Sequence, residues 1–289
     1  MKPHLEQINA TDKNSFLCRY FSLHHFDTKF HFHPEYELTL IEKSCGKRFV
    51  GHHMGPFKPG DIVLIGKQVP HCWLNEANVP EDHHASSIVV QFSENFLGQQ
   101  WLATPEFSSI MKMLRLSERG ILFHPQVGYC AAPLMRDLLK LSPFERIIRF
   151  LELLQLLAIE ESYTLLNDQQ NIKFTEEDCT RIQVVLEYIR SNFTEEIRLE
   201  EVAEMMYMTQ TSFCRYFKKI TRKTFIRFLI EYRMDYARTQ LIHSDKSITG
   251  ICYESGFRNI AHFNQQFKIL NHMVPREYRK QFTDVSMFS

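Results

Sequence analysis

The C-terminal third of the chain contains the same short pattern twice. Residues 211–218 (TSFCRYFK) align with residues 261–268 (AHFNQQFK) at an offset of 50, and both copies carry two phenylalanines four positions apart. Residues 199–203 (LEEVA) align in the same way with residues 248–252 (ITGIC) at an offset of 49. Because a turn between the two segments can absorb the single extra residue, the pattern predicts a helix–turn–helix unit that occurs twice.

Each unit has the residues that start and separate two helices. In the second unit Ser247 and Asn259 are placed to cap the two helices, and Gly256 supplies the turn between them. In the first unit Thr209 is placed to cap the second helix. The paired phenylalanines then face inward, and the opposite face carries Arg, Lys, Asn, Gln and Thr side chains. Such side chains hydrogen-bond base edges and phosphates in the major groove, so the pattern indicates DNA binding.

A single long helix is predicted between the two units. Residues 225–242 (FIRFLIEYRMDYARTQLI) extend ~27 Å at ~1.5 Å per residue. A helix of that length can hold two recognition helices about one DNA turn apart, ~34 Å, once their own dimensions are added. One chain could then enter two successive major grooves. The alternative is a helical partner-binding domain whose charges are only solvated.

Charge is distributed unevenly along the chain. The 289 residues, a length typical of two domains, include 34 Lys or Arg and 34 Asp or Glu. Residues 205–280 contain 14 basic and 5 acidic residues, so the rest of the chain carries the compensating negative charge. Ten of the 14 histidines lie within the first 84 residues. This asymmetry predicts two parts with different partners.

The part of the chain before the repeat changes its period once. Residues 16–92 have short apolar runs separated by turn signals, which predicts a β-sandwich or small barrel. Residues 93–166 have a helical period, clearest in residues 144–158, where Ser142 and Pro143 make a good helix start. Apolar residues cover more of that helix than one packing surface requires. We expect either an ordinary core helix or one that also packs on a second copy, in a homodimer formed through residues 144–165.

The repeated units resemble the DNA-binding domain of the AraC/XylS family of transcriptional regulators. The resemblance rests on residues 199–218, 232–241, 248–257, 262–268 and 275–279, which agree with the family in order and spacing. It implies an α+β protein, in which an N-terminal cupin-like β-barrel with appended helices precedes an all-α DNA-binding domain. That domain would consist of two helix–turn–helix units joined by a linker helix.

The resemblance also implies domain boundaries and DNA contacts. The implied domains are an effector-binding and dimerisation domain over residues 1–166, a linker over 167–176 and a DNA-binding domain over 177–289. Arg215 is the strongest single prediction, because a guanidinium can engage guanine O6 and N7 together. The full predicted DNA-binding set is Thr211, Ser212, Cys214, Arg215, Lys218, Lys219, Asn259, Ala261, Asn264, Gln265 and Lys268. Its lysines are expected at phosphates and the others at bases or helix caps.

The sequence departs from the family at four turn positions. Arg222 and His272 stand where a glycine usually follows each recognition helix, so a positive φ there would imply strain. Tyr207 occupies the first turn, where glycine is common, and Arg198 occupies a position that often holds a Ser or Thr cap. These departures concern local geometry rather than the assignment of the domain.

Histidines gather in the predicted strand region. His31, His33, Glu35 and Glu37 alternate, so they are expected on one face of a strand, and His71 follows 40 residues after His31. This spacing resembles the two half-motifs of cupin barrels, in which three histidines and a glutamate bind a metal ion. Three alternatives remain open: a metal such as Fe, Mn, Ni or Zn, an organic effector, or purely structural histidines. We favour the organic effector, assign no cofactor or metal, and predict the effector-binding residues His31, His33, Glu37, His71 and Trp73.

The leading function is therefore that of a transcriptional regulator that binds double-stranded DNA and a small effector such as a sugar, and not that of an enzyme. The alternative is a cupin metalloenzyme with an accessory helical domain, and a third class is an adaptor that binds only protein. No apolar stretch reaches ~18 residues and no apolar segment follows the N-terminus, so neither a membrane span nor a secretory signal is expected. Seven scattered cysteines predict reduced thiols and a cytoplasmic location.

Overall fold

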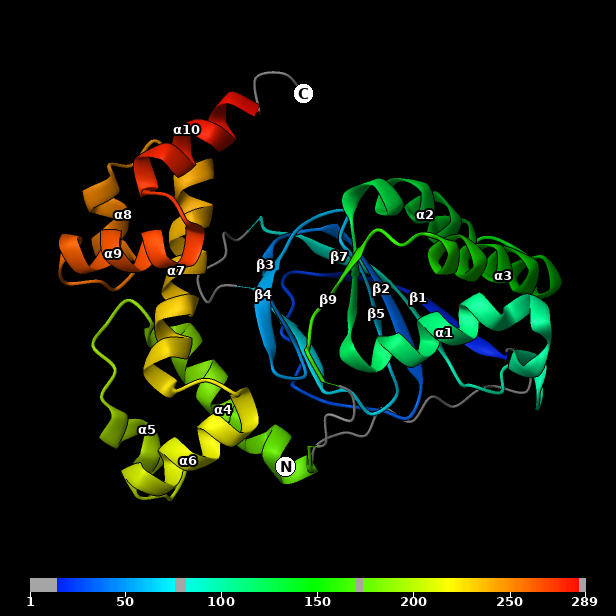
Figure 1. Cartoon of the computed structure of the whole chain (residues 1–289), viewed down its shortest axis with the longest axis horizontal. Helices are drawn as coiled ribbons and strands as arrows, with labels where there is room; N and C mark the ends of the chain where they lie inside the picture. Colours follow the sequence, from blue (N-terminus) through cyan, green and yellow to red (C-terminus); the bar gives the residue numbers. More distant parts are fainter. Residues whose placement is uncertain (1–14, 76–81, 170–173, 286–289) are drawn as a thin grey trace. The chain divides into compact units, whose positions relative to one another are not determined.

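The computed structural model describes residues 15–75, 82–169 and 174–285, and it separates into two compact units. The first unit spans residues 1–180 and the second spans residues 181–289. Part of the predicted linker, residues 170–173, lies outside the described residues. Strands occur in the first unit and helices make up the second, which confirms the predicted α+β class (Figure 1).

The first unit contains two antiparallel sheets. Six strands form one sheet in the order β1-β7-β2-β5-β8-β9, and three strands form the other in the order β4-β3-β6. The strands are β1 (Phe16–Leu23), β2 (Tyr36–Lys43), β3 (Gly46–Val50), β4 (His53–Phe57), β5 (Ile62–Ile65), β6 (His71–Leu74), β7 (Ala85–Phe92), β8 (Ile121–Phe123) and β9 (Tyr163–Leu165).

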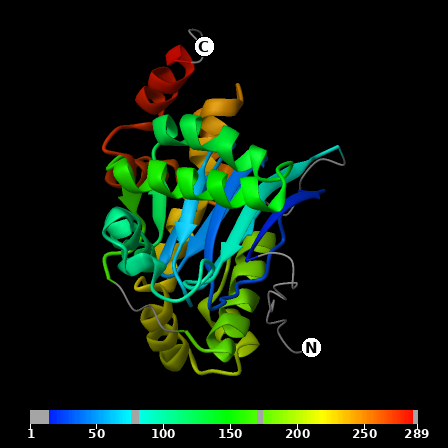
Figure 2. The ribbon, with the colours of Figure 1, turned by 90° about the vertical axis from the view of Figure 1, so that its right-hand side faces the viewer.

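Helices cover one face of the six-stranded sheet, as Figure 2 shows. Leu38 and Leu40 of β2 point to this face and belong to one apolar core with Phe150 and Leu154. The opposite face meets the three-stranded sheet, where Ile41 packs in a second core. The helices of this unit are α1 (Ser108–Leu116), α2 (Pro125–Asp137) and α3 (Pro143–Ile159), with short 3₁₀ helices η1 (Trp101–Ala103), η2 (Pro105–Phe107) and η3 (Ser117–Arg119).

Helix α3 begins where the sequence predicts. Ser142 and Glu145 form a reciprocal capping box, and the hydrogen bonds that Glu145 accepts from Ser142 lower its pKa. The helix buries Phe150, Leu153, Leu154 and Leu157 against the sheet and the neighbouring helices. Its exposed side still carries apolar side chains, with Phe144 at 72% and Ile148 at 46% exposure.

Two details of the first unit differ from the prediction. The helical region also contributes β8 and β9 to the large sheet, and strands of three residues are too short to show a period of two. The expected strand through residues 31–35 is wrong, because β2 begins only at Tyr36. Pro34 has no N–H to donate, so the ladder cannot run through it.

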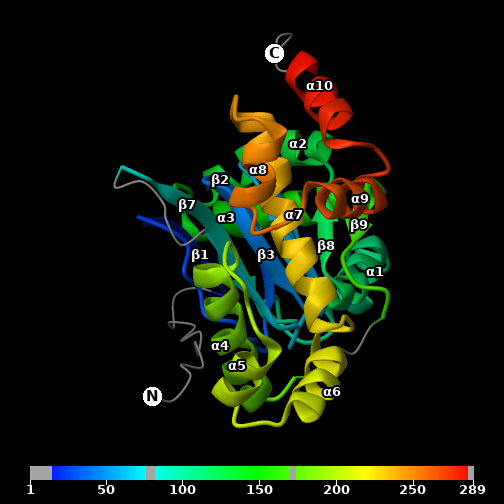
Figure 3. The same ribbon diagram turned by 90° about the vertical axis from the view of Figure 1, so that its left-hand side faces the viewer.

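The second unit consists of helices arranged around one long helix. Figure 3 shows α7 running between the group formed by α4, α5 and α6 and the group formed by α8, α9 and α10. Helix α7 confirms the long helix predicted between the repeats. The helices are α4 (Glu176–Asn192, most of which belongs to this unit), α5 (Leu199–Met205), α6 (Gln210–Thr221), α7 (Phe225–His243), α8 (Ile248–Glu254), α9 (Ile260–Asn271) and α10 (Pro275–Val285).

The paired phenylalanines of the repeat build the core of each group. Phe213 and Phe217 of α6 are fully buried and pack edge-to-face on Phe225 at 5.5 and 5.4 Å between ring centroids. Phe263 and Phe267 of α9 are equally buried and belong to the apolar core that α7 and α8 share with α9. The predicted caps are confirmed, because side-chain oxygens of Thr209, Ser247 and Asn259 each accept a backbone N–H of the helix that follows.

The turns of the two repeats have the same backbone form but different surroundings. Gly256 has φ +80°, and a Cβ built on it would lie 2.3 Å from the carbonyl oxygen of Phe193 and 2.8 Å from Nε of Arg233. Tyr207 takes the corresponding place in the first repeat with φ +53°, and its side chain is 99% exposed. The second turn therefore needs glycine for space as well as for its dihedral angle.

The four departures from the family pattern appear in the structure as expected. Arg222 and His272 adopt the left-handed conformation with φ of +59° and +58°, as Tyr207 also does. A left-handed residue other than glycine costs roughly 1–2 kcal/mol, so the predicted strain is present. Arg198 is the N-cap of α5 and makes no side-chain cap hydrogen bond.

Candidate nucleic-acid interface and ligand-binding cavity

The candidate nucleic-acid interface lies on the outer faces of α6 and α9. Because the phenylalanines of α6 turn inward, the positions between them turn outward. The guanidinium of Arg215 makes no hydrogen bond or ion pair within the described part of the chain. All six predicted residues of α6 are exposed: Thr211, Ser212, Cys214, Arg215, Lys218 and Lys219.

Helix α9 presents a less charged face. Ala261, Gln265 and Lys268 are exposed, and Asn264 is partly buried. Asn259 is exposed, but its side-chain oxygen already accepts the N–H groups of Ala261 and His262 as the helix cap. The face carries one lysine and no arginine, so it offers fewer groups for bidentate base contacts than α6 does.

Many of the other basic side chains in this unit are already engaged. Lys223 and Arg227 both pair with Glu231, at 2.5 and 2.8 Å between nitrogen and oxygen. Arg233 donates to the backbone carbonyls of Phe193 and Glu195 at 2.7 and 2.6 Å. Further ion pairs join Arg238 to Asp235, Lys246 to Glu254 and Arg258 to Glu196. The lysines and arginine on α6 thus remain available for an anionic partner.

The first unit contains a cavity of about 160 Å³ on the inner face of the six-stranded sheet. Residues 37, 39, 87, 89 and 91 line it, because every second residue of β2 and β7 points away from the helices. Phe26, His31 and Trp73 also line it. Apolar rings with a few converging polar groups are typical of small-molecule sites.

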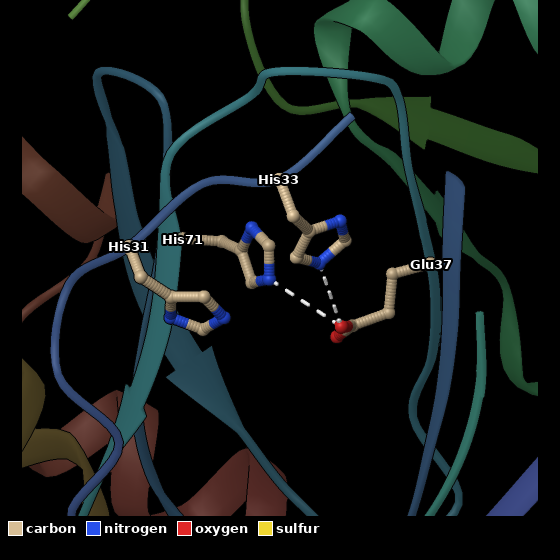
Figure 4. A group of neighbouring side chains, drawn as sticks. All are labelled: His31, His33, Glu37 and His71. Atoms are coloured by element: carbon tan, nitrogen blue, oxygen red, sulfur yellow. Dashed lines mark hydrogen bonds and ion pairs between the residues drawn. The ribbon is translucent and has the colours of Figure 1, made fainter. Parts of the chain in front are cut away.

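Four ionisable side chains meet at one end of this cavity. One nitrogen from each of His31, His33 and His71 and one carboxylate oxygen of Glu37 all lie within 4.8 Å of one another. Figure 4 shows the three rings and the carboxylate facing one another. Oε2 of Glu37 lies 3.2 Å from Nε2 of His33 and 3.5 Å from Nε2 of His71.

Backbone geometry fixes two of these histidines. His31 and His71 form an isolated antiparallel bridge, with N···O distances of 3.2 and 2.8 Å in the two directions. Nδ1 of His31 lies 2.7 Å from the carbonyl oxygen of Lys29, and Nδ1 of His71 lies 2.8 Å from that of Val69. When each Nδ1–H donates to its carbonyl, Nε2 is the ring nitrogen of His31 and of His71 that faces the cluster.

The carboxylate of Glu37 is held from the sheet. Thr39 donates to Oε1 at 2.8 Å, and the side-chain amide of Gln91 donates to Oε2 at 2.9 Å. Burial would raise the pKa of Glu37, but the charge of His71 and the hydrogen bond from His33 hold that pKa well below its ordinary value. The cluster therefore contains a carboxylate at neutral pH.

The histidines have unlike electrostatic environments. Burial and the charge of His71 lower the pKa of His31 to about 4, so His31 is neutral at pH 7. Burial also lowers the pKa of His33, but the hydrogen bond and charge of Glu37 raise it by more, so the net shift is upward. Nδ1 of His33 faces Glu35 at 3.5 Å. A simple alternating strand pattern would place such polar side chains on a solvent-exposed face of the sheet, but here that face is buried.

The structure brings together all five residues that the sequence predicts for an effector. His31, Glu37 and Trp73 line the cavity, while His33 and His71 lie in the adjoining cluster. Sequence reasoning missed Thr39 and Gln91. Thr39 could have been found from its spacing of two from Glu37 on the same strand, whereas Gln91 becomes a neighbour only through the pairing of β2 with β7.

Comparison with known families identifies the second unit. Residues 202–281 match the family model described as "Helix-turn-helix domain". The regulator YdeC of Bacillus subtilis is 30% identical over 100 residues, which are 35% of this chain and 34% of that protein. The regulatory protein PocR of Salmonella typhimurium is 32% identical over 107 residues, 37% of this chain and 35% of that protein. The chain thus matches about a third of the length of these curated relatives.

A solved structure spans more of the chain at lower similarity. ToxT from Vibrio cholerae is 15% identical, with a TM-score of 0.37, and the match covers 93% of this chain and 100% of that one. Among the described residues, no helix is both long and apolar enough to cross a membrane. All seven cysteines lie in the described residues, and no disulfide joins any two of them.

Proposed function

We propose, from the premise that the second unit is a DNA-binding domain of the AraC type, that this chain is a sequence-specific transcriptional regulator controlled by a small molecule. Residues 177–289 would bind double-stranded DNA, and residues 1–166 would bind the effector and form the dimer. The observation that carries this proposal is the repeated helix–turn–helix with an outward cationic face on α6. Each recognition helix would occupy one of two successive major grooves.

The cavity of the first unit supports control by a small effector. Its lining combines the Trp73 ring with the polar groups of Glu37, Thr39 and Gln91. Nε1 of Trp73 is buried and has no hydrogen-bond partner in the described structure, so a ligand oxygen could satisfy it. An effector alters DNA binding only if it binds one arrangement of the chain more tightly than another.

The comparisons give no support to the alternative of a metalloenzyme with an accessory helical domain, because the helix–turn–helix match concerns regulators. An adaptor that binds only protein would not need an exposed, unpaired Arg215 one turn before the exposed Lys218 and Lys219. We therefore propose a regulator that is not an enzyme and acts in the cytoplasm, where the free thiols stay reduced.

The regulator is proposed to be a homodimer formed through residues 144–165. Replacing both Phe144 and Ile148 by serine is expected to raise the dimer dissociation constant at least about tenfold, because both side chains would lose apolar burial. Sedimentation velocity over a micromolar concentration series measures this. Lys112→Ser, at an exposed polar position of α1 outside residues 144–165, is the control. A wild-type chain that sediments as a monomer at micromolar concentration would contradict the dimer.

Arg215 and Lys218 should affect DNA binding in different ways. Arg215→Ala is expected to reduce the difference in binding free energy between cognate and random DNA by ~1–3 kcal/mol, since a base contact is lost. Lys218→Ala should weaken binding to both DNAs. It should also reduce the steepness of the plot of log binding constant against log salt concentration by about one, since a phosphate contact is lost. Genomic footprinting supplies the cognate site, and fluorescence anisotropy at several salt concentrations measures the affinities.

The two variants control for each other because both side chains are exposed on α6 and neither has a partner in the described structure. Loss of affinity without loss of specificity in Arg215→Ala would remove its role in base recognition. Absence of DNA binding by the wild-type chain at any salt concentration would overturn the proposed function.

A further inference from the structure

We propose that the second unit contains a small-molecule site of its own, and that this site binds a small organic anion with an apolar body. A cavity of about 280 Å³ lies between one face of α7, the loop before α5 and the turn that joins α8 to α9. It is larger than the 160 Å³ cavity of the first unit and close to the ~300 Å³ at which ligand pockets usually begin. All of its lining residues belong to the second unit.

One face of α7 forms an apolar wall of this cavity. Residues 226, 229, 230 and 233 recur with helical spacing, so they share that face of the helix. Ile226 is 55% exposed, and an exposed isoleucine next to buried neighbours gives a ligand apolar surface to cover. The apolar residues of the lining are Ile197, Ile226, Leu229, Ile230 and Phe257.

The charged part of the lining is positive on balance. Arg233 of α7 and Arg258 of the turn line the cavity, against a single acidic residue, Glu196. Arg258 pairs with Glu196 at 2.9 Å, but the two side chains are 74% and 55% exposed, and ion pairs in solvent are weak. An anion that enters the cavity can therefore compete with Glu196 for Arg258.

Arg233 has hydrogen-bond partners but no counter-charge. It donates from Nε to the carbonyl oxygen of Phe193 and from Nη2 to that of Glu195. These bonds use two of its five N–H groups, and a carbonyl brings no negative charge. Burial and the nearby charge of Arg258 lower the pKa of Arg233, so the two guanidinium groups repel each other. An anionic head group close to both would relieve this repulsion.

The lining also defines the class of ligand. Among its described residues none has a hydroxyl or amide side chain, whereas the cavity of the first unit has Thr39, Ser87 and Gln91. A polyol would thus leave its hydroxyl groups without partners here, and an inorganic anion would leave the apolar wall uncovered. Small aromatic or branched-chain carboxylates, and sulfonates of the same shape, satisfy both parts of the lining. The two cavities therefore favour different ligands.

A bound anion would oppose DNA binding, a step that rests on the proposed function. Arg258 directly precedes Asn259, and His262 directly follows Ala261. Asn259 and Ala261 belong to the predicted DNA-binding set, so the rim of the cavity adjoins the face of α9 that would enter a major groove. A negative charge at this rim repels the phosphates of the approaching DNA. The site would then give the regulator a second input besides the effector of the first unit.

The test is a calorimetric titration of the full chain, without DNA, with naphthalene-1-sulfonate. This probe joins an apolar ring system to a permanent negative charge. It should bind saturably at the second unit, and both neutral naphthalene-1-sulfonamide and inorganic sulfate should bind at least about tenfold more weakly, because each lacks one of the two features.

Two variants locate the probe. Ile226→Glu should weaken binding at least about tenfold, because it replaces apolar surface by a like charge, and an acidic residue in the first turn of α7 suits the helix. Arg258→Ser should weaken binding about three- to tenfold through the lost cation. Ile269→Glu makes the same change at an isoleucine that is 51% exposed and outside the lining, so it should bind as the wild type does.

A wild-type chain that does not bind naphthalene-1-sulfonate, or that binds the neutral sulfonamide equally well, would overturn the site. Binding that survives both Ile226→Glu and Arg258→Ser, in variants with the wild-type circular dichroism spectrum, would place the probe elsewhere and overturn it as well. Because no DNA is present, these results leave the DNA-binding proposal standing, and a chain that binds the probe but no DNA leaves the site standing.

Fluorescence anisotropy with the cognate DNA then tests the antagonism. Saturating naphthalene-1-sulfonate should weaken DNA binding by the wild-type chain at least about tenfold and should have little effect on Ile226→Glu. An equal DNA affinity of the wild-type chain with and without the probe would overturn the antagonism.

Discussion

Replacing Phe263 by alanine is expected to lower the free energy of unfolding of the second unit by ~3–5 kcal/mol. The ring is fully buried and packs edge-to-face on Phe257 and at a tilt on Phe267, at centroid distances of 5.3 and 5.9 Å. Its removal opens a cavity where α7, α8 and α9 share one core, and the capped helices around it cannot close that space without losing their own contacts.

The two tryptophans allow the units to be followed separately. Trp73 and Trp101 are the chain's two tryptophans, and both lie in the first unit. Phe263→Ala should therefore shift the urea transition seen by far-ultraviolet circular dichroism and leave the tryptophan fluorescence transition in place. Ile269→Ala, which truncates a side chain 51% exposed on the same helix, is the matched control. Equal stability of the two variants would show that α9 does not depend on this core.

Replacing Asp61 by asparagine is expected to destabilise the first unit by ~3–5 kcal/mol, because it leaves a buried guanidinium without its counter-charge. Arg48 of β3 is 2% exposed, and its Nη1 donates to Oδ2 of Asp61 at 3.3 Å. Burial lowers the pKa of Arg48 and raises that of Asp61, in each case by more than the partner's charge opposes. The pair itself is thus a weak source of stability, although breaking it is costly.

A double variant separates the destabilisation caused by breaking the ion pair from the stability that the intact pair contributes. Arg48→Met combined with Asp61→Asn removes both charges, so it should recover much of the stability that Asp61→Asn loses. The readout is the tryptophan fluorescence transition in urea, with circular dichroism as the check on the second unit. An Asp61→Asn variant within ~1 kcal/mol of wild type would mean that solvent reaches Arg48 and screens it.

The second unit could be predicted from the sequence almost element by element, because its signals are local. Caps such as Ser247 and Asn259, the paired phenylalanines and the turn glycine each act within a few residues. Because the motif is repeated, each signal can also be compared with the corresponding position in the second copy. The left-handed turns at Arg222 and His272 could be expected because the family that the sequence resembles usually has glycine at these two positions.

The first unit could be predicted only in outline, because its organisation depends on contacts between distant residues. Strands β8 and β9 are three residues long and acquire their role only by pairing with β5 and with each other. The segment before β2 was expected to belong to that strand, but the strand begins only after Pro34, which cannot donate a backbone hydrogen bond. The histidine cluster was predictable as a set, since the spacing of His31, His33, Glu37 and His71 is distinctive. The support from Gln91 was not, because it depends on the register of β7.

The two turns of the repeat also differ in how freely they can diverge. Gly256 is enclosed by the carbonyl oxygen of Phe193, which follows α4, and by the side chain of Arg233 in α7, so any side chain there would displace these contacts of the turn after α8. Tyr207 projects into solvent, so only its positive φ restricts which residues can replace it. Over evolutionary time the first turn can accept different residues and so change the surface of the protein, while the second turn has to keep its glycine. Diversity among related chains should accordingly accumulate at one half of the duplicated motif and not at the other.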